Sequence, residues 1–160
     1  MLKKVFDKLK ERLAMVPDVK LVDWFNNQYE GVIHAAPCIF VDFPKPITMG
    51  QLRGRVQHGL LTVRIHAVSK VVNRADYSID PAGIELHEVL VDNIYAVLQQ
   101  YSATENGSIP IFGTMSRNEV EHHPYNKGWM ITTQDFVCLV NQNEVSISAP
   151  ITGIEIEMVN

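Results

Sequence analysis

The sequence predicts an α+β fold: a mainly antiparallel sheet of five or six strands, with two principal helices packed on one face. Two observations predict the sheet. Residues 59–69 alternate between apolar and polar side chains, and residues 129–140 form a second long strand that ends apolar on both faces. A third observation predicts the helices, because apolar residues recur at three- and four-residue spacing in residues 2–15 and 81–101.

Length and composition indicate one globular domain spanning residues 1–160, since 46% of the residues are hydrophobic and 20% are charged. The net charge of -4 argues against general nucleic-acid binding, which usually leaves a basic surface. No apolar run approaches the roughly 20 residues that span a membrane, and we expect no signal peptide. Cys38 and Cys138 each lie in an apolar run, which favours two buried free thiols over a disulfide.

The first helix, at residues 2–15, has an apolar stripe with lysines between its members, and Pro17 ends the pattern. Its basic face is interpreted as solvated, with a membrane-surface or partner-docking role as the alternative. Strands are predicted next at residues 19–25 and 37–43, the second bounded by Pro37 and Pro44.

The link at residues 44–58 is too long for an ordinary hairpin turn. Two alternatives remain for it: a long β-arm whose strands continue past the sheet, or a mobile loop. We predict that it projects from the sheet and that Arg53 and Arg55 pair with carboxylates of an adjacent subunit.

The strand at residues 59–69 has one apolar face for the core and one polar face, formed by Thr62, Arg64 and His66, for water or a partner. After it, Asp80 and Pro81 predict the start of the core helix at residues 81–101. His87 lies on the apolar stripe of this helix and is interpreted as a packed core histidine. The residues expected to be buried are Val63, Ile65, Val91, Ile94, Phe136 and Leu139.

The last third of the chain is predicted as a polar loop at residues 102–107, a short strand at 115–121, the long strand at 129–140 and a final strand at 154–158. Glu155 and Glu157 face outward on that final strand. Asp42 and Asp135 interrupt apolar strands and are interpreted as strand-end or edge carboxylates that block wrong pairing.

No catalytic or cofactor-binding motif is present: serine hydrolase, kinase, P-loop and dinucleotide signatures are all missing from the sequence. We therefore expect no enzyme activity, no cofactor and no metal. The best metal candidate is His122-His123, in a predicted loop near Glu119 and Glu121. Neighbouring residues on a strand point in opposite directions, so this pair would need irregular backbone. A small metal-dependent hydrolase using His122 and His123 remains an alternative function.

Four segments together carry a resemblance to a known family. They are VDWFNNQYE, APCIFVDFP, GLLTVRIHAVS and WMITTQDFVCLV, with a long helix before the last. In this order they resemble the tail-terminator and tail-completion proteins of long-tailed bacteriophages. The matching positions are Val22-Asp23, Gln28, Pro37 to Phe43, Gly59 to Val68, Leu90 to Leu98 and Trp129 to Val140, and the resemblance covers roughly residues 19 to 141.

The resemblance implies a structural subunit of a phage or prophage virion tail, assembled in the bacterial cytoplasm. Members of that family form a ring, usually hexameric, that caps the tail tube and presents a surface to the head. The implied partners are other copies of the chain, the tail-tube and head-connector proteins, and DNA that only passes through the ring. A neck or head-completion protein of the same assembly is the alternative.

Candidate interface residues follow from exposed strand faces and from the link. An uncovered sheet face or edge is expected to meet a partner. The residues assigned to an oligomer interface are Arg53, Arg55, Arg64, His66, Glu155 and Glu157.

Overall fold

The structure, a computed structural model, describes residues 1–30, 36–53, 56–71, 74–76, 78–126 and 128–142. In these ranges the elements follow in the order α1 (Leu2–Leu13), β1 (Leu21–Trp24), η1 (Gln28–Glu30), β2 (Cys38–Asp42), β3 (Met49–Arg53), β4 (Val56–Lys70), α2 (Pro81–Leu98), β5 (Ala103–Glu105), β6 (Ile109–Phe112), β7 (Ser116–Asn126) and β8 (Trp129–Gln142). The predicted last strand at residues 154–158 lies outside the described residues.

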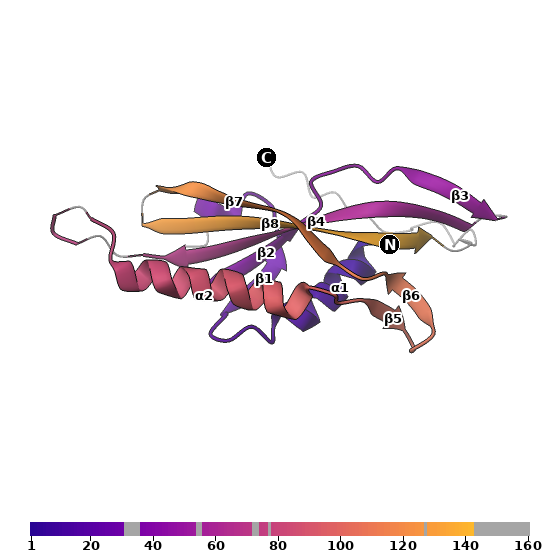
Figure 1. The fold of residues 1–160 in the computed structure, drawn as a ribbon, viewed down its shortest axis with the longest axis horizontal. Helices are drawn as coiled ribbons and strands as arrows, with labels where there is room; N and C mark the ends of the chain where they lie inside the picture. The colour runs from indigo at the N-terminus through magenta and orange to yellow at the C-terminus, as the bar shows by residue number, and fades with distance from the viewer. Residues whose placement is uncertain (31–35, 54–55, 72–73, 77, 127, 143–160) are drawn as a thin grey trace, which may run out of the picture.

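Six strands form one sheet in the order β1-β2-β4-β8-β7, with β3 paired to β4 beside that path. Only β1 and β2 pair in parallel; the other described pairs are antiparallel. Figure 1 shows α1 and α2 on the same side of this sheet. The predicted α+β fold is confirmed.

The central pair of the sheet is β4 with β8, paired from Gln57–Gln142 to Lys70–Trp129. The predicted strand at residues 59–69 therefore extends beyond its expected start. The long strand at the C-terminal end of the described chain takes the central position that its apolar character predicts, between β4 and β7.

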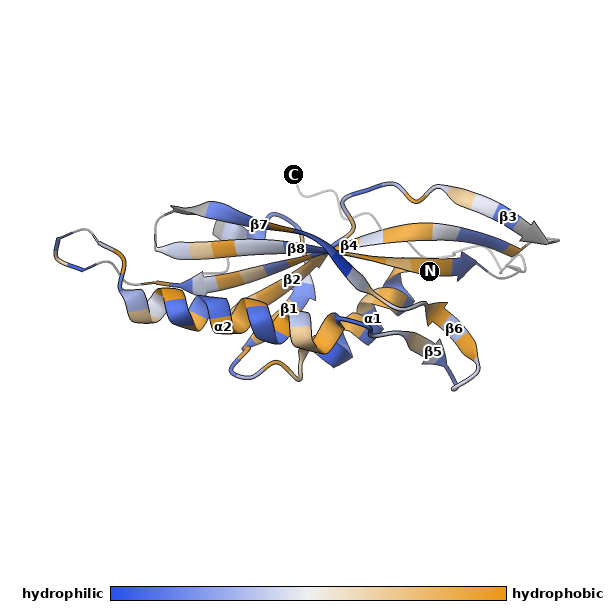
Figure 2. Ribbon diagram, viewed as in Figure 1, coloured by the Kyte–Doolittle hydropathy of each residue, from blue (hydrophilic) through white to orange (hydrophobic). Residues whose placement is uncertain are grey.

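The core lies between the sheet and the two helices, which agrees with the predicted inward faces. Val63 and Ile65 on β4 are buried, as are Val91 and Ile94 on α2 and Phe136 on β8. Figure 2 shows the mixed character of α2, on which apolar and polar residues alternate along the helix. The apolar stripe of α1 joins the same cluster through Val5, Leu9 and Leu13.

Helix α2 begins as predicted and ends earlier than predicted. The Asp80 carboxylate accepts a hydrogen bond from the Ala82 N–H at 3.4 Å, and Pro81 occupies the first helical position. The helix ends at Leu98 instead of residue 101, because Gln99 is extended and Gln100 has φ of 62°. The backbone has already left the helical region at these two residues.

The predicted polar loop at residues 102–107 contains strand β5, which pairs with β6 in a separate two-stranded sheet. Asn106, Gly107 and Ser108 connect the two strands, and Asn106 and Gly107 have φ of 52° and 73°. An Asn-Gly dipeptide with two positive φ values is a strong hairpin signal. The loop prediction overlooked this turn.

The link at residues 44–58 forms strand β3, which pairs antiparallel with the start of β4. Because β8 pairs with the other edge of β4 as far as Gln57, β3 is part of the sheet and does not continue past it as the β-arm alternative predicted. We call residues 43–53 and 56–63 the arm; Figure 1 shows β3 and the adjacent end of β4 at one end of the molecule. A Cβ at Gly59 would lie 2.6 Å from the side chains of Ile47 and Met49. The segment before β3 can approach β4 this closely because residue 59 is a glycine.

Candidate interaction surface on the outer face of the sheet

Every second residue of β4 and β8 points away from both helices, and we call this side of the sheet the outer face. Its cross-strand pairs, from the arm to the opposite end, are Leu60–Leu139, Thr62–Val137, Arg64–Asp135, His66–Thr133 and Val68–Ile131. The surface changes along this row from exposed apolar side chains, through an ion pair, to a covered aromatic cluster.

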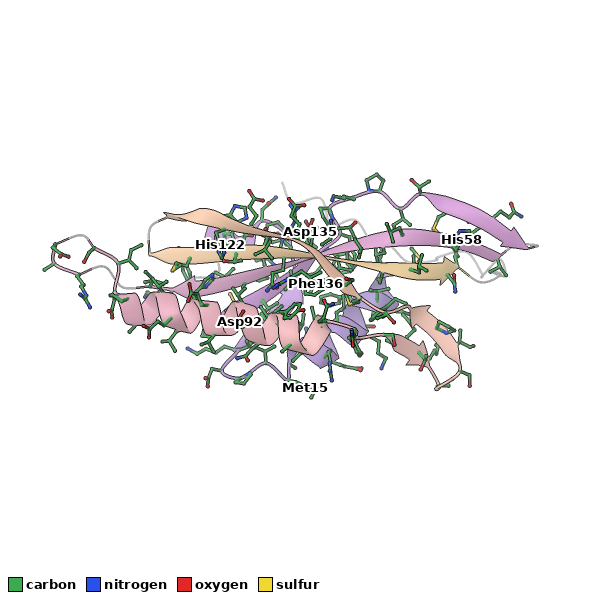
Figure 3. The ribbon with its side chains drawn as sticks, viewed as in Figure 1. Met15, His58, Asp92, His122, Asp135 and Phe136 are labelled. Atoms are coloured by element: carbon green, nitrogen blue, oxygen red, sulfur yellow. The ribbon has the colours of Figure 1, made fainter. Side chains whose placement is uncertain are left out.

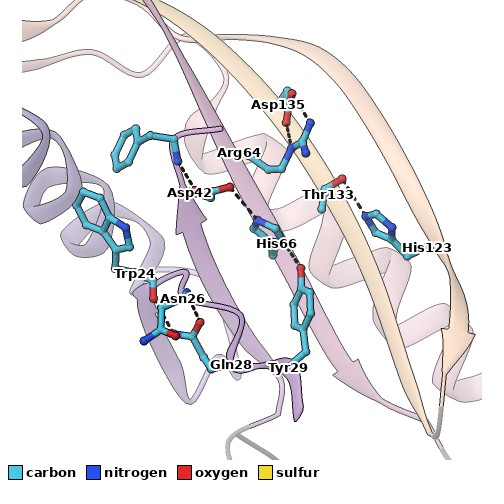
Figure 4. Close-up of polar contacts among 11 residues, drawn as sticks. Trp24, Asn26, Gln28, Tyr29, Asp42, Arg64, His66, His123, Thr133 and Asp135 are labelled. Carbon is cyan, nitrogen blue, oxygen red and sulfur yellow. Dashed lines mark hydrogen bonds and ion pairs between the residues drawn. The ribbon is translucent and has the colours of Figure 1, made fainter. Parts of the chain in front are cut away.

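The ion pair in the middle of the outer face joins Arg64 to Asp135 in a bidentate geometry (Figure 4). Arg64 Nε donates to Asp135 Oδ1 at 2.6 Å, and Nη2 donates to Oδ2 at 3.0 Å. The hydrogen bonds that Arg64 donates to Asp135 raise the pKa of the Arg64 guanidinium, which stays charged. Lys45 Nζ approaches Asp135 Oδ2 at 3.9 Å.

The interpretation of Asp135 as an edge carboxylate is wrong. Asp135 lies in the central strand β8 and is buried, so its charge is compensated by Arg64 from the neighbouring strand. The pair occupies one cross-strand position, where opposite charges stabilise the two strands.

His66 is buried under its own chain, which contradicts its prediction as an exposed interface residue. The Phe25 ring stacks on the His66 imidazole with centroids 4.1 Å apart, and the Tyr29 hydroxyl hydrogen-bonds to Nδ1. Nε2 lies 4.0 Å from Asp42 Oδ2 and has no hydrogen-bond partner within the described chain. Burial, with a smaller effect of Arg64, lowers the pKa of His66 to about 4, so the ring is neutral at pH 7.

The aromatic cluster around His66 explains this burial. Segment 25–30 crosses the outer face at this end, and Phe25 and Tyr29 pack against Cys38, Phe40 and Val68. Thr62 is also buried, so it is not exposed as predicted either. The sequence prediction assumed that the polar side of β4 was free, and it did not account for a covering segment from residues outside the strand.

Leu60 and Leu139 form an exposed apolar pair at the arm end of the outer face. Their exposed fractions are 56% and 58%, although Leu139 was expected in the core. The prediction failed because β8 is apolar on both faces near its end, and that pattern was interpreted as burial on both sides. Cys138 and Val140 face the core, so Leu139 must point outward. The pair is the feature of this surface that sequence reasoning missed.

His122 and His123 lie in strand β7 and not in a loop as predicted. His122 Nδ1 is 2.8 Å from Thr132 Oγ1, whereas His123 Nε2 is 3.3 Å from Thr133 Oγ1. Thr132 and Thr133 are adjacent on β8, so the two imidazoles lie on opposite faces of the sheet. Within the described part of the chain, no three His, Cys, Asp or Glu side chains are grouped to hold a metal ion.

His87 is buried between α2 and the sheet, which confirms its interpretation as a core histidine. Its Nδ1 lies 2.9 Å from Ser69 Oγ and its Nε2 lies 2.8 Å from Thr132 Oγ1. Burial lowers the pKa of His87 to about 4. The neutral ring thus connects α2 to both central strands through two hydrogen bonds, and buried polar groups satisfied in this way specify how a helix docks.

Both cysteines are buried and free, as predicted. Burial raises the pKa of the Cys38 thiol to about 11 and that of Cys138 to about 12. Both remain protonated at neutral pH, a state in which thiols are poor nucleophiles.

The predicted interface residues are not brought together as one site in the described part of the chain. Arg64 is engaged by Asp135 and His66 is covered by aromatic rings. Arg53 is the last residue of strand β3, and its side chain is not among those that the structure describes. Arg55, Glu155 and Glu157 also lie outside the described residues.

None of the helices in the described ranges is long and apolar enough to cross a membrane. No protein-family model matches the sequence, and no curated protein matches it either.

Proposed function

We propose that this protein is a structural subunit of a phage or prophage tail, a tail-terminator-like protein that forms a ring, caps the tail tube and joins it to the head. The observation that supports it best is the exposed Leu60–Leu139 pair on a sheet face that neither helix covers. The resemblance of residues 19–141 to the tail-terminator family supports the identity of the assembly.

The exposed pair favours association because the contact of two adjacent leucine side chains with water is unfavourable. Fully burying a leucine side chain stabilises a complex by about 1.5–3 kcal/mol before the costs of association. The pair lies on two long paired strands, so binding costs little backbone conformational entropy. A rigid apolar patch of this kind is typical of a protein interaction surface.

The polar groups of the outer face also support a structural role. Arg64 binds Asp135, and His66 binds Tyr29, so these polar groups are engaged by side chains of their own chain. In a ring, the net charge of -4 on each copy would repel DNA, which would pass through without binding.

The test is to add purified protein to phage tails that lack their terminator and to examine them by electron microscopy. Wild-type protein should produce tails of uniform length that join heads. Leu139→Glu should abolish this, because a charge in the apolar patch opposes burial. Met15→Glu is the matched control, since Met15 is a 63% exposed apolar residue at the end of α1, outside the outer face.

Tails that stay overlong and unjoined in the presence of folded wild-type protein would refute the terminator function. Protein that binds heads and leaves tails unchanged would favour the neck or head-completion alternative instead.

A further inference from the structure

Two exposed apolar patches lie on different elements of the molecule. In the described part of the chain, five large apolar side chains are more than half exposed, and four of them form two pairs. One pair is Leu60–Leu139 on the outer face. The other is Leu86 and Val89, one turn apart on α2, with exposed fractions of 71% and 54%. Exposed apolar patches on a folded domain mark places where partners bind.

The α2 patch borders a pocket of about 300 Å³. Leu86, Val89 and Leu90 line it from the helix, and Pro17 and Pro37 line it from the opposite side. Its lining also includes Asp18 and Lys70, whose opposite charges cancel. An apolar side chain inserted into a pocket of this kind is the usual anchor of a protein interface.

The two patches lie on segments of opposite net charge. Residues 81–98 contain Glu85, Glu88 and Asp92 and no lysine or arginine, a net charge of -3 from three acids and no bases. All three acids are exposed and form no ion pair with the described residues. Figure 3 shows Asp92 on α2 and His58 on the arm, in different parts of the molecule.

The arm has the complementary charge. Its residues, 43–53 and 56–63, contain Lys45 and Arg53 and no acidic residue, a net charge of +2 from two bases and no acids. Lys45 is about half exposed, and its nearest carboxylate is that of Asp135, which already binds Arg64. Charge complementarity selects partners and orients their approach.

The two surfaces cannot meet within one molecule. Leu60 and Leu139 point to the outer face, whereas α2 lies on the opposite side of the sheet, and the arm and the start of α2 lie towards opposite ends (Figure 1). We infer that the arm of one copy docks on the exposed face of α2 of a second copy. Leu60 and Leu139 then cover Leu86 and Val89, and the basic arm, with the exposed Lys45, lies against the three acids.

A contact between two different surfaces is heterologous, so two copies joined by it keep one free arm and one free helix face between them. Such contacts repeat head to tail and close only as a ring. The inference deepens the proposed function, on which the closure of the ring rests, and it names the two surfaces that meet.

Disulfide trapping tests the contact. The variant Leu60→Cys with Val89→Cys should give a ladder of linked oligomers under mild oxidation, since each chain offers both halves of the contact. Cys38 and Cys138 are buried and should not react. The control is Leu60→Cys with Ile109→Cys, which pairs the arm with a 46% exposed residue on β6, in the second sheet, and should stay monomeric.

Two outcomes would overturn the contact. A Leu60→Cys with Val89→Cys variant that links no better than its control would show that these surfaces do not meet. Dimers formed by Leu60→Cys alone would show that the arm meets its own copy symmetrically. In a mixture of chains that carry Leu60→Cys alone and chains that carry Val89→Cys alone, each chain can form one disulfide. Linked dimers without larger products in this mixture would support the heterologous contact.

Charge reversal tests the electrostatic half. Glu88→Arg in the double-cysteine variant should reduce the ladder several-fold, and adding Lys45→Glu to the same chain should restore it. Equal amounts of disulfide-linked oligomer in all three proteins would show that these charges do not contribute to the contact.

Trapping on assembled tails separates the contact from the proposed function. If wild-type protein completes tails while the double-cysteine variant forms no disulfide between its two introduced thiols on them, the contact is wrong and the proposed function stands. If the disulfides form and tails stay unfinished, the contact stands and the tail function fails.

Discussion

The two ends of the outer face are built from the same two strands and differ in what covers them. At one end, segment 25–30 places Phe25 and Tyr29 over Phe40 and His66. At the arm end, Leu60 and Leu139 are more than half exposed. Both ends show apolar residues on outward positions. Alternation therefore decides which way a side chain points, whereas burial depends on whether another segment of the chain crosses the strand.

The largest expected effect is at the covered end. Phe40→Ala should reduce the free energy of unfolding by about 3–5 kcal/mol, because it removes a fully buried ring and leaves a cavity under Phe25 and Tyr29. Urea unfolding followed by circular dichroism measures this. A loss below about 1 kcal/mol would mean that segment 25–30 does not hold the cluster closed.

The covered end should also respond to acid. His66 has a pKa of 6.5 when solvated and about 4 in the folded protein, so the unfolded chain takes up the proton first as the pH falls. The stability contributed by the neutral ring is present above pH 6.5 and is lost towards pH 4, by at most about 3 kcal/mol. The free energies of unfolding at pH 7 and at about pH 4.5 should therefore differ less in His66→Gln than in wild type. Some difference should remain, because the pKa of His87 is lowered in the same way. An unchanged difference would show that His66 is open to water.

The smallest effect on the free energy of unfolding is expected at the arm end of the outer face. Leu139→Ala should change the unfolding free energy of the monomer by no more than about 0.5 kcal/mol, since its side chain is largely solvated already. The same variant should weaken self-association, measured by sedimentation over a range of concentrations. A large loss of monomer stability would show that Leu139 is covered within its own chain and would remove the contrast between the two ends.

The sequence predicted the fold class because periodicity is local information. The alternation in residues 59–69, the apolar stripes of the two helices and the cap formed by Asp80 are each visible within a short window. The inward positions of Val63, Ile65 and Phe136 follow from the same period. These features needed no knowledge of distant residues.

The surface could not be predicted in the same way, because it depends on contacts between distant segments. Nothing near His66 in the sequence indicates that Phe25 stacks on it, and nothing near Asp135 indicates that Arg64 is its partner. Leu139 was assigned to the core because an apolar strand end looks the same whether it is covered or bare. One signal was present and overlooked: Asn106-Gly107, which predicts the β5–β6 hairpin.

The Arg64–Asp135 pair has a consequence for how the chain avoids misfolding. Strands β4 and β8 are long and similarly patterned, so a slide of two residues would keep every side chain on its correct face. That slide would place Arg64 opposite Val137 or Thr133 and leave the Asp135 carboxylate buried without its partner. An uncompensated buried charge costs several kcal/mol, which makes the slipped isomers poor competitors. The Arg64–Asp135 pair in the middle of β4 and β8 therefore favours the native register of the two strands over registers shifted by two residues.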